Sequence, residues 1–134
     1  MKKIITTDKA PKAIGPYSQA VEMNGTVYVS GQVPVNPSKG QIDQFDISGQ
    51  TEQVLKNIGN ILKSEGCTYS DVVKTTVFLS DLANFNAMNE VYSKYFTTDP
   101  PARSTVQVSG LPLGALVEIE SVAVRSFIQK QSRT

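Results

Sequence analysis

The sequence predicts a single α+β domain in which two helices pack on one face of a mixed β-sheet of about six strands. Two segments with helical spacing of apolar residues alternate with shorter segments rich in β-branched residues. Strands joined through a helix are usually parallel and strands joined by a tight turn are antiparallel, so this order predicts a mixed sheet. A chain of 134 residues suffices for one domain. We expect residues 1–127 to form it and the polar residues 128–134 to be a frayed tail.

The first elements are expected to be a short N-terminal strand and a β-hairpin. Strand-like segments at residues 20–23 and 26–30 flank Asn24-Gly25, a pair that suits the two positive-φ positions of a type I′ turn. Prolines, glycine and aspartate then follow between residues 34 and 43, so this stretch is predicted to be a loop.

Two helices are predicted next. Apolar residues recur on one helical face between residues 47 and 65, with Asp46 as a candidate N-cap and Gly66 as the C-terminal stop. A second helix is expected from about residue 84 to 96, because prolines at 100 and 101 prevent its continuation.

Three more strands complete the prediction. The β-branched segment 72–79 lies between the two helices, and segments 103–108 and 116–127 follow the second helix. A glycine- and proline-containing loop at residues 110–114 separates the last two strands.

Several predicted strands are apolar on both faces, although two helices can cover only one face of a sheet. The segments concerned are 27–29, 77–79 and 122–124. Because no other segment is available to cover the second face, we expect a homo-oligomer whose interface includes the sheet.

The composition excludes several classes of site. The chain has no histidine and one cysteine, Cys67, so it lacks the residues for zinc clusters, Ser/His/Asp triads, Cys/His dyads and disulfide frameworks. Acid–base chemistry must come from carboxylates, tyrosines, lysines, backbone groups or water. With 13 Lys and Arg against 12 Asp and Glu, and no run of four basic residues, the sequence gives little support for binding nucleic acid or an anionic membrane.

No targeting or membrane segment is expected. The N-terminus turns polar after its first five residues, and no later stretch approaches the roughly 20 apolar residues of a membrane span. We therefore expect a soluble, cytoplasmic protein, and a lone cysteine agrees with a reducing compartment.

The charged candidates for a functional site are Arg103, Glu118 and Glu120. Arg103 follows a stiff Pro-Pro-Ala segment and could offer a planar fork to a carboxylate, although an ordinary salt bridge is the alternative. Glu118 and Glu120 alternate with apolar residues and so point to one side of their strand, where burial could raise a pKa. The alternative is a pair of rim carboxylates matched to Arg125 or a lysine.

The uncharged candidates are less specific. Asn89 lies on the apolar side of the second helix, where its amide either fixes the packing or faces a ligand. The Tyr17 hydroxyl could donate to a ligand or only pack, and Ser30-Gly31 could allow close approach of a ligand or form a bulge. From the residues alone, the sequence indicates a cofactor-free small-molecule site or a binding module.

Five motifs taken together resemble the RidA (YjgF/UK114) family. The resemblance is collinear from about residue 2 to residue 126, and the pairing of Pro-Ala-Arg-Ser with Glu-Ile-Glu is its most specific part. The motifs lie at residues 14–19 (IGPYSQ), 30–34 (SGQVP), 73–78 (VKTTVF), 101–104 (PARS) and 117–120 (VEIE).

The resemblance implies a fold, an assembly and an activity. It implies a homotrimer with a chorismate-mutase-like α+β fold and ligand clefts between subunits. The implied activity is hydrolysis of reactive 2-imino and 2-enamino acids, such as 2-iminobutanoate and 2-iminopropanoate, to 2-oxo acids and ammonia. Pyridoxal-phosphate enzymes such as threonine dehydratase release these substrates, and the hydrolysis uses no metal or organic cofactor.

The resemblance also assigns roles to individual residues. The carboxylate-binding arginine of the family falls on Arg103, the water-positioning glutamate falls on Glu118, and Tyr17 could assist proton delivery. Residues matching the lining of the cleft are Tyr17, Ser30, Gly31 and Asn89.

Two positions depart from the family pattern. Thr105, counted here among the substrate-binding residues, stands where relatives often have cysteine, which excludes a mechanism that needs a thiol there. Leu113 stands where a basic residue usually follows Leu-Pro, which alters the rim of the cleft.

A non-enzymatic role is the alternative. Some relatives are described as regulatory binding trimers, translation inhibitors, RNA-cleaving proteins or chaperones. For RNA cleavage this chain offers neither a basic run nor a pair of histidines.

Overall fold

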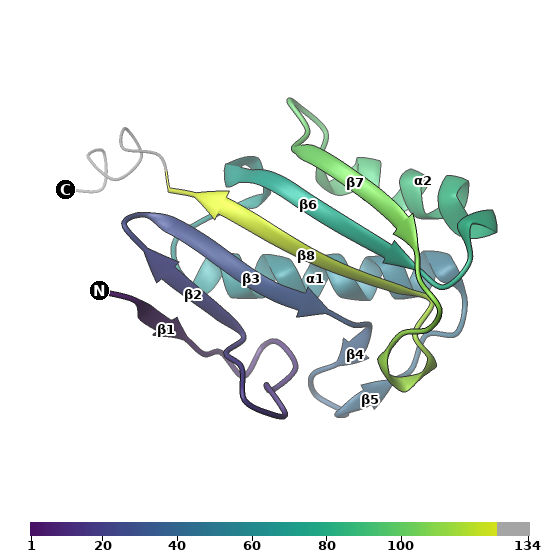
Figure 1. Cartoon of the computed structure of the whole chain (residues 1–134), viewed down its shortest axis with the longest axis horizontal. Helices are drawn as coiled ribbons and strands as arrows, with labels where there is room; N and C mark the ends of the chain where they lie inside the picture. Colours follow the sequence, from purple (N-terminus) through teal and green to yellow (C-terminus); the bar gives the residue numbers. More distant parts are fainter. Residues whose placement is uncertain (126–134) are drawn as a thin grey trace.

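A computed structural model describes residues 1–125 of the chain. A mixed sheet and two α-helices make up the described part, as the sequence predicts (Figure 1). The helices are α1 (Ile47–Ser64) and α2 (Phe85–Tyr95), and short 3₁₀ turns lie at η1 (Tyr69–Asp71), η2 (Leu82–Asn84) and η3 (Pro112–Gly114). The sheet contains β1 (Lys3–Ile5), β2 (Ala20–Met23), β3 (Thr26–Gln32), β6 (Val72–Leu79), β7 (Ala102–Gln107) and β8 (Val117–Val124).

The strand order in the sheet is β1-β2-β3-β8-β6-β7. Only β6 and β7 are parallel among these described neighbours, and α2 connects them. The crossover through α1 also leaves β3 and β6 pointing the same way, but β8 lies between them and is antiparallel to both. The last strand therefore completes the centre of the sheet, so this fold depends on contacts between residues distant in sequence.

The hairpin prediction is confirmed by the backbone. Asn24 and Gly25 have φ values of 52° and 86°, as a type I′ turn requires, and β2 pairs with β3 around them.

The prediction of a plain loop between residues 34 and 43 is wrong in part, because β4 (Val35–Asn36) and β5 (Gln41–Ile42) pair there. Strands of two residues are too short to show alternation in the sequence.

Helix α1 begins and ends at the predicted signals. The Asp46 side chain accepts a hydrogen bond from the Gly49 amide at 2.9 Å. At the other end, Gly66 adopts φ 71°, and the Cys67 amide donates to the Leu62 carbonyl at 2.9 Å. The strand expected at residues 116–127 is observed as β8, which ends at Val124. Residues 126 and 127 of the expected strand and the tail expected at 128–134 lie outside the described part of the chain.

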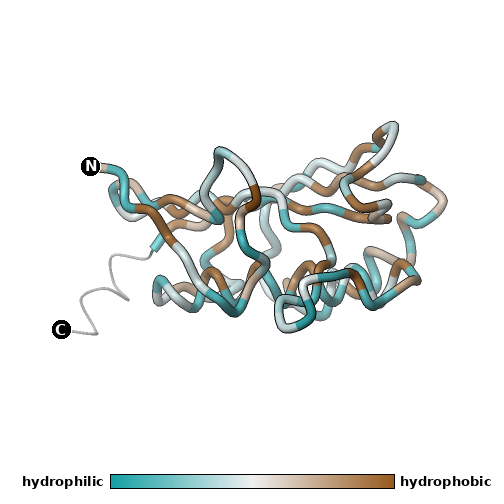
Figure 2. The backbone as a smooth tube through the Cα atoms, turned by 90° about the horizontal axis from the view of Figure 1, so that it is seen from below, coloured by the Kyte–Doolittle hydropathy of each residue, from teal (hydrophilic) through white to brown (hydrophobic). Residues whose placement is uncertain are grey.

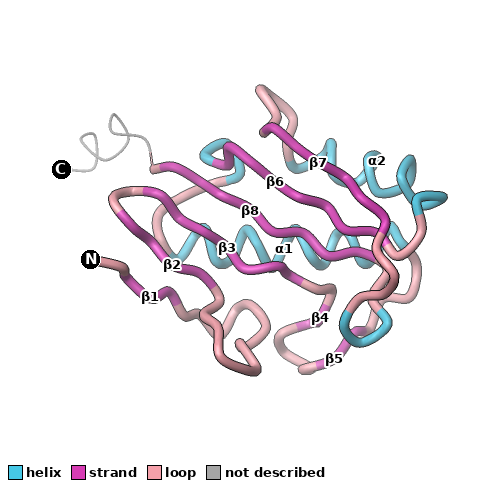
Figure 3. Tube along the Cα trace, in the orientation of Figure 1, coloured by secondary structure: helices cyan, strands magenta, loops and turns pink. Residues whose placement is uncertain are grey.

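Both helices pack on the same face of the six-stranded sheet, so the protein has two layers (Figures 2 and 3). Alternate residues of the central strands are buried against the helices, among them Val77 and Leu79 of β6 and Val117 and Ile119 of β8. We call the other side of this sheet the open face. Within residues 1–125 no helix covers it, which confirms the predicted one-sided packing.

Candidate active site

The guanidinium of Arg103 is held between β7 and α2. Arg103 pairs with Thr75 of β6, a fully buried residue, so its side chain leaves the sheet on the helix side. Its Nη1 donates to Asn89 Oδ1 at 2.7 Å, and its Cζ lies 4.8 Å from the ring centre of Tyr92 and 5.6 Å from that of Phe85. The aromatic rings and the amide fix the plane of the guanidinium.

Arg103 retains donors for a ligand. Among residues 1–125 no carboxylate lies within ion-pair distance of it, so the alternative of an ordinary salt bridge within the chain is not observed. A guanidinium held in plane with free N–H groups suits a planar anion such as a carboxylate.

Thr105 lies two residues farther along β7 on the same side of the sheet. It pairs with the buried Val77, and its Oγ1 is buried without a hydrogen-bond partner in the described part of the chain. A buried hydroxyl that lacks a partner is costly, so this position favours a polar ligand beside Arg103. We call Asn89, Arg103 and Thr105 the arginine group.

The second group of candidate residues lies on the open face. Glu118 of β8 pairs with Phe78 of β6, and its carboxylate packs directly on the backbone of Gly31. A Cβ at residue 31 would overlap the Glu118 carboxylate, so glycine is needed here for the observed rotamer. The register of β3 against β8 shifts between Val29 and Gln32, which is the bulge considered for Ser30-Gly31.

Ser30 ties the bulge to the loop that carries Tyr17. The Ser30 hydroxyl donates to the Ser18 carbonyl at 2.6 Å, and the Ser30 amide donates to the Gln19 carbonyl at 2.9 Å. The Tyr17 hydroxyl accepts a bond from the Ile14 amide at 3.3 Å, which leaves its own proton available for donation. Tyr17 and Ser30 line one groove of about 360 Å³. We call Tyr17, Ser30, Gly31 and Glu118 the glutamate group.

Burial raises the pKa of the Glu118 carboxyl above its ordinary value, and the negative charge of Glu120 on the same face raises this pKa further. Arg125 is not a partner of these carboxylates, so the part of the sequence-based alternative that matched them to Arg125 is wrong. Its Nη2 donates to the Glu65 carbonyl at 2.7 Å and lies 3.4 Å from Glu65 Oε1. A carboxylate with a raised pKa can accept a proton from water.

The two groups lie on opposite faces of the sheet in one chain. Arg103 contacts α2 on the helix side, whereas Glu118 lies on the open face. The sheet separates them, so a small molecule cannot contact both groups of the same copy. A site that uses both must be formed by two copies of the chain.

Other kinds of site find less support in the described residues. No cluster of three or more histidine, cysteine, aspartate or glutamate residues suited to a metal ion occurs there. Likewise, none of the helices that the structure describes is long and apolar enough to cross a membrane.

Sequence reasoning placed Tyr92 and Phe85 only in the apolar stripe of the second helix. Both rings also face Arg103. The spacing of Phe85, Asn89 and Tyr92 by four and three residues puts them on one helical face, and this was the available signal.

Comparison with known proteins decides the family. The model of the family described as endoribonuclease L-PSP, which is the RidA/YjgF family, matches residues 7–125. The chain belongs to the RidA family.

Individual RidA relatives resemble the chain over nearly its whole length. The human protein named 2-iminobutanoate/2-iminopropanoate deaminase is 49% identical over 125 residues, which cover 93% of this chain and 91% of that protein. The structure of RidA from an Antarctic Psychrobacter has a TM-score of 0.88 at 44% identity, covering 91% of this chain and 98% of that one. Escherichia coli TdcF with bound serine also has a TM-score of 0.88 at 44% identity, covering 92% and 99% of the two chains. The predicted fold class is confirmed.

Proposed function

We propose that this RidA-family protein hydrolyses reactive 2-imino and 2-enamino acids, among them 2-iminobutanoate and 2-iminopropanoate, to 2-oxo acids and ammonia. The observation that carries the proposal is an arginine held in plane with free donors, together with a glutamate of raised pKa. The name of the human relative and the serine bound to the Escherichia coli relative support a substrate of amino-acid size with a carboxylate.

The arginine group binds the substrate. Arg103 forms two parallel hydrogen bonds to the carboxylate, and the Thr105 hydroxyl supplies a further donor beside it. Because an imine carbon is already electrophilic, the protein needs to orient the substrate and activate a water, and no protein nucleophile is required.

The glutamate group delivers the water. Glu118 accepts a proton as the water oxygen bonds to C2 of the imine, and the imine nitrogen gains a proton. In the resulting tetrahedral intermediate Glu118 returns its proton to the nitrogen, and the C2 hydroxyl passes its proton to Tyr17 in exchange for the one that Tyr17 gave to the nitrogen. The C2–N bond then breaks, so that ammonia leaves, the 2-oxo acid remains and both side chains are restored. Tyr17, whose proton is available, assists transfer to the nitrogen. One water is consumed and no electrons are exchanged, so we propose that no cofactor takes part.

Two copies supply each site. Arg103 comes from one copy and Glu118 from the next, in the homotrimer that the family resemblance implies. Opposite placement of the two groups on the sheet supports this arrangement. We place the protein in the cytoplasm beside pyridoxal-phosphate dehydratases, which supply its substrates.

A coupled assay tests the function. Threonine dehydratase generates 2-iminobutanoate from threonine, and the release of 2-oxobutanoate is followed with and without the protein. We expect faster release with the wild type and a large loss with Arg103→Lys, which keeps the charge but lacks the planar fork. Light scattering should show the assembly of this variant intact, and Lys94→Ala, at an exposed site on α2, should match the wild type.

Two results would contradict the proposal. Near-normal turnover by Arg103→Lys would remove Arg103 as the carboxylate-binding residue. Binding of 2-oxobutanoate without any increase in its rate of release would favour the regulatory binding role, and cleavage of added RNA would favour the ribonuclease role.

A further inference from the structure

We propose that Lys74 of each copy pairs with Glu120 of the next copy across the open face of the sheet, and that this ion pair helps to determine how the copies associate. The proposal rests on the two-copy site of the proposed function. It concerns two residues that take no step in the proposed hydrolysis, although the charge of Glu120 contributes to the raised pKa of Glu118.

The open face has the character of an interface. The register places Ile4, Val21, Tyr28, Val122 and Lys74 in one row across five strands. Ile4 is 52% exposed and Tyr28 is 49% exposed, so large apolar surface faces outward in this row. A contiguous exposed apolar patch of this kind is typical of a protein–protein interface.

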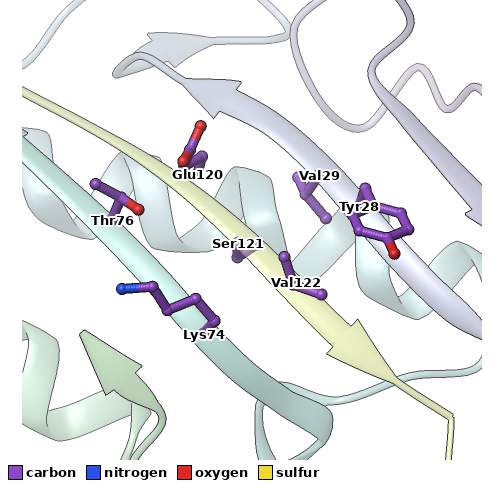
Figure 4. A pocket seen from close by; sticks show the side chains of 7 residues that line it. All are labelled: Tyr28, Val29, Lys74, Thr76, Glu120, Ser121 and Val122. Carbon is purple, nitrogen blue, oxygen red and sulfur yellow. The ribbon is translucent and has the colours of Figure 1, made fainter. Parts of the chain in front are cut away.

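Lys74 and Glu120 carry opposite charges and lie among the apolar residues of the open face. They line one hollow of about 170 Å³ together with Thr76 and Tyr28 (Figure 4). They do not pair with each other, and neither forms an ion pair with any other residue in the described part of the chain.

The two side chains also point in different directions (Figure 4). Lys74 Nζ donates to Ser104 Oγ of β7 at 3.3 Å, so the ammonium is turned toward the edge of the sheet. Glu120 lies on the central strand β8 opposite Thr76. A second copy that buries this face must provide each charge with a partner, because an unpaired charge is costly to bury.

The two-copy site indicates which partner each charge meets. Lys74 pairs with Ala102, the residue before Arg103, and Glu120 is two residues from Glu118 on the same face of β8. Arg103 leaves the β7 edge on its helix side, and the Lys74 ammonium is turned toward the same edge on the open face. An edge that lies against the open face of the next copy at Glu118 therefore has Arg103 on one side and Lys74 on the other, where Lys74 meets Glu120. In a closed ring of identical copies every contact between neighbours is the same. Each copy therefore contributes Lys74 to one neighbour and Glu120 to the other.

Other charged groups fit this pairing less well. Glu118 is half-buried on Gly31, whereas Glu120 is exposed. Lys2 lies at the far edge of the sheet beyond β2, and Lys3 is bound to Glu65 at 3.0 Å. The remaining titratable group that faces the hollow is Tyr28 of β3.

Charge reversal tests the pair. Lys74→Glu and Glu120→Lys are made singly and together, and the size of each assembly is followed by light scattering over a dilution series. Each single reversal places like charges across the interface, so we expect its dissociation concentration to rise by about 10-fold or more. The double variant restores opposite charges and should return close to the wild type. Lys94→Glu, a reversal on the helix side, serves as the matched control and should assemble normally.

Neutral variants are used if a reversal prevents folding, which circular dichroism will reveal. Lys74→Met and Glu120→Gln should each weaken the assembly, and the double neutral variant should weaken it by less than the product of the two single effects. Wild-type assembly of both single variants, or independent effects in the double variants, would overturn the proposal. Because none of these measurements uses an imine, absence of deaminase activity would contradict the proposed function without touching this pair.

Discussion

Gly31 illustrates how a single missing side chain positions the candidate water-activating group. The Glu118 carboxylate occupies the space that a Cβ at residue 31 would fill, and Gly31 does not have a positive φ, so alanine is compatible with the backbone. We expect Gly31→Ala to fold normally and to displace Glu118, lowering kcat/KM by about 10-fold or more, because a small misplacement of a reacting group is costly. The coupled dehydratase assay and a thermal melt measure the two effects.

Gly110→Ala is the control for this substitution. Gly110 has open space around it and does not have a positive φ, so an added methyl group should change neither activity nor stability. If Gly31→Ala retained wild-type kcat/KM, the position of the Glu118 carboxylate on Gly31 would be irrelevant to catalysis.

The raised pKa of Glu118 predicts where activity is lost at low pH. Glu118 must be ionised to accept a proton from water, so activity falls as pH drops through its pKa. Burial and the nearby Glu120 raise this pKa above the ordinary value of 4.5, so the loss begins at a higher pH than for an exposed glutamate. NMR titration of the carboxyl carbons, assigned with Glu118→Gln, measures the pKa directly. A Glu118 carboxyl that titrates at or below 4.5 would contradict the expectation.

At the scale of elements, α2 and β7 act as one unit that fixes Arg103. Asn89 contributes a hydrogen bond from the middle of α2, and Tyr92 of the same helix is itself held by a hydroxyl–hydroxyl bond to Thr75 at 2.7 Å. This chain of contacts links the helix to both strands of the parallel pair. The orientation of the guanidinium is therefore a property of the packed unit as well as of residue 103.

Replacing Asn89 tests this unit. In Asn89→Ala the guanidinium loses one of its orienting partners, so we expect a several-fold higher KM with a smaller change in kcat. The lost hydrogen bond should lower the free energy of unfolding by about 1 kcal/mol. Asn86→Ala, at an exposed position one turn earlier on α2, should leave both parameters unchanged. A several-fold loss of kcat with an unchanged KM would mean instead that Asn89 acts on the chemical step.

The elements also show what the sequence could and could not predict. The β2–β3 hairpin and α1 were predictable because local signals, Asn24-Gly25 and Asp46 with Gly66, decide them. The insertion of β8 between β3 and β6 could not be predicted, because pairing between residues about 90 positions apart leaves no local pattern in the sequence. For the same reason the sequence indicated Arg103 and Glu118 as candidates but could not place them on opposite faces of the sheet.

At the scale of the whole molecule, the sheet separates the arginine group from the glutamate group. Each copy then carries two half-sites that face different neighbours, which relates the uncovered apolar face to the chemistry. An open face that packs against the β7 edge and α2 of another copy would bring a glutamate group to each arginine group. The assembly would thus be required for activity.

Mixing two inactive variants tests this arrangement. Arg103→Ala lacks the arginine group's guanidinium and Glu118→Ala lacks the carboxylate, so each alone should be inactive. When equal amounts are dissociated and reassembled together, about one site in four receives an intact arginine group from one variant and an intact glutamate group from the other. We therefore expect about a quarter of wild-type activity in the coupled assay, whereas sites formed within one copy would remain inactive.

The double variant Arg103→Ala/Glu118→Ala, reassembled with wild type, provides the complementary measurement. If each site uses two copies, both must be wild type, so about a quarter of the sites remain active; if each site uses one copy, about half remain active. Copies that failed to exchange would give the same two values as single-copy sites, none and half, so exchange is verified first with a charge-tagged copy that separates mixed assemblies by ion-exchange chromatography. Once exchange is verified, recovery of no activity in the first mixture together with half in the second would show that Arg103 and Glu118 of one copy act together, and the separation of the two groups by the sheet would then have to change in solution.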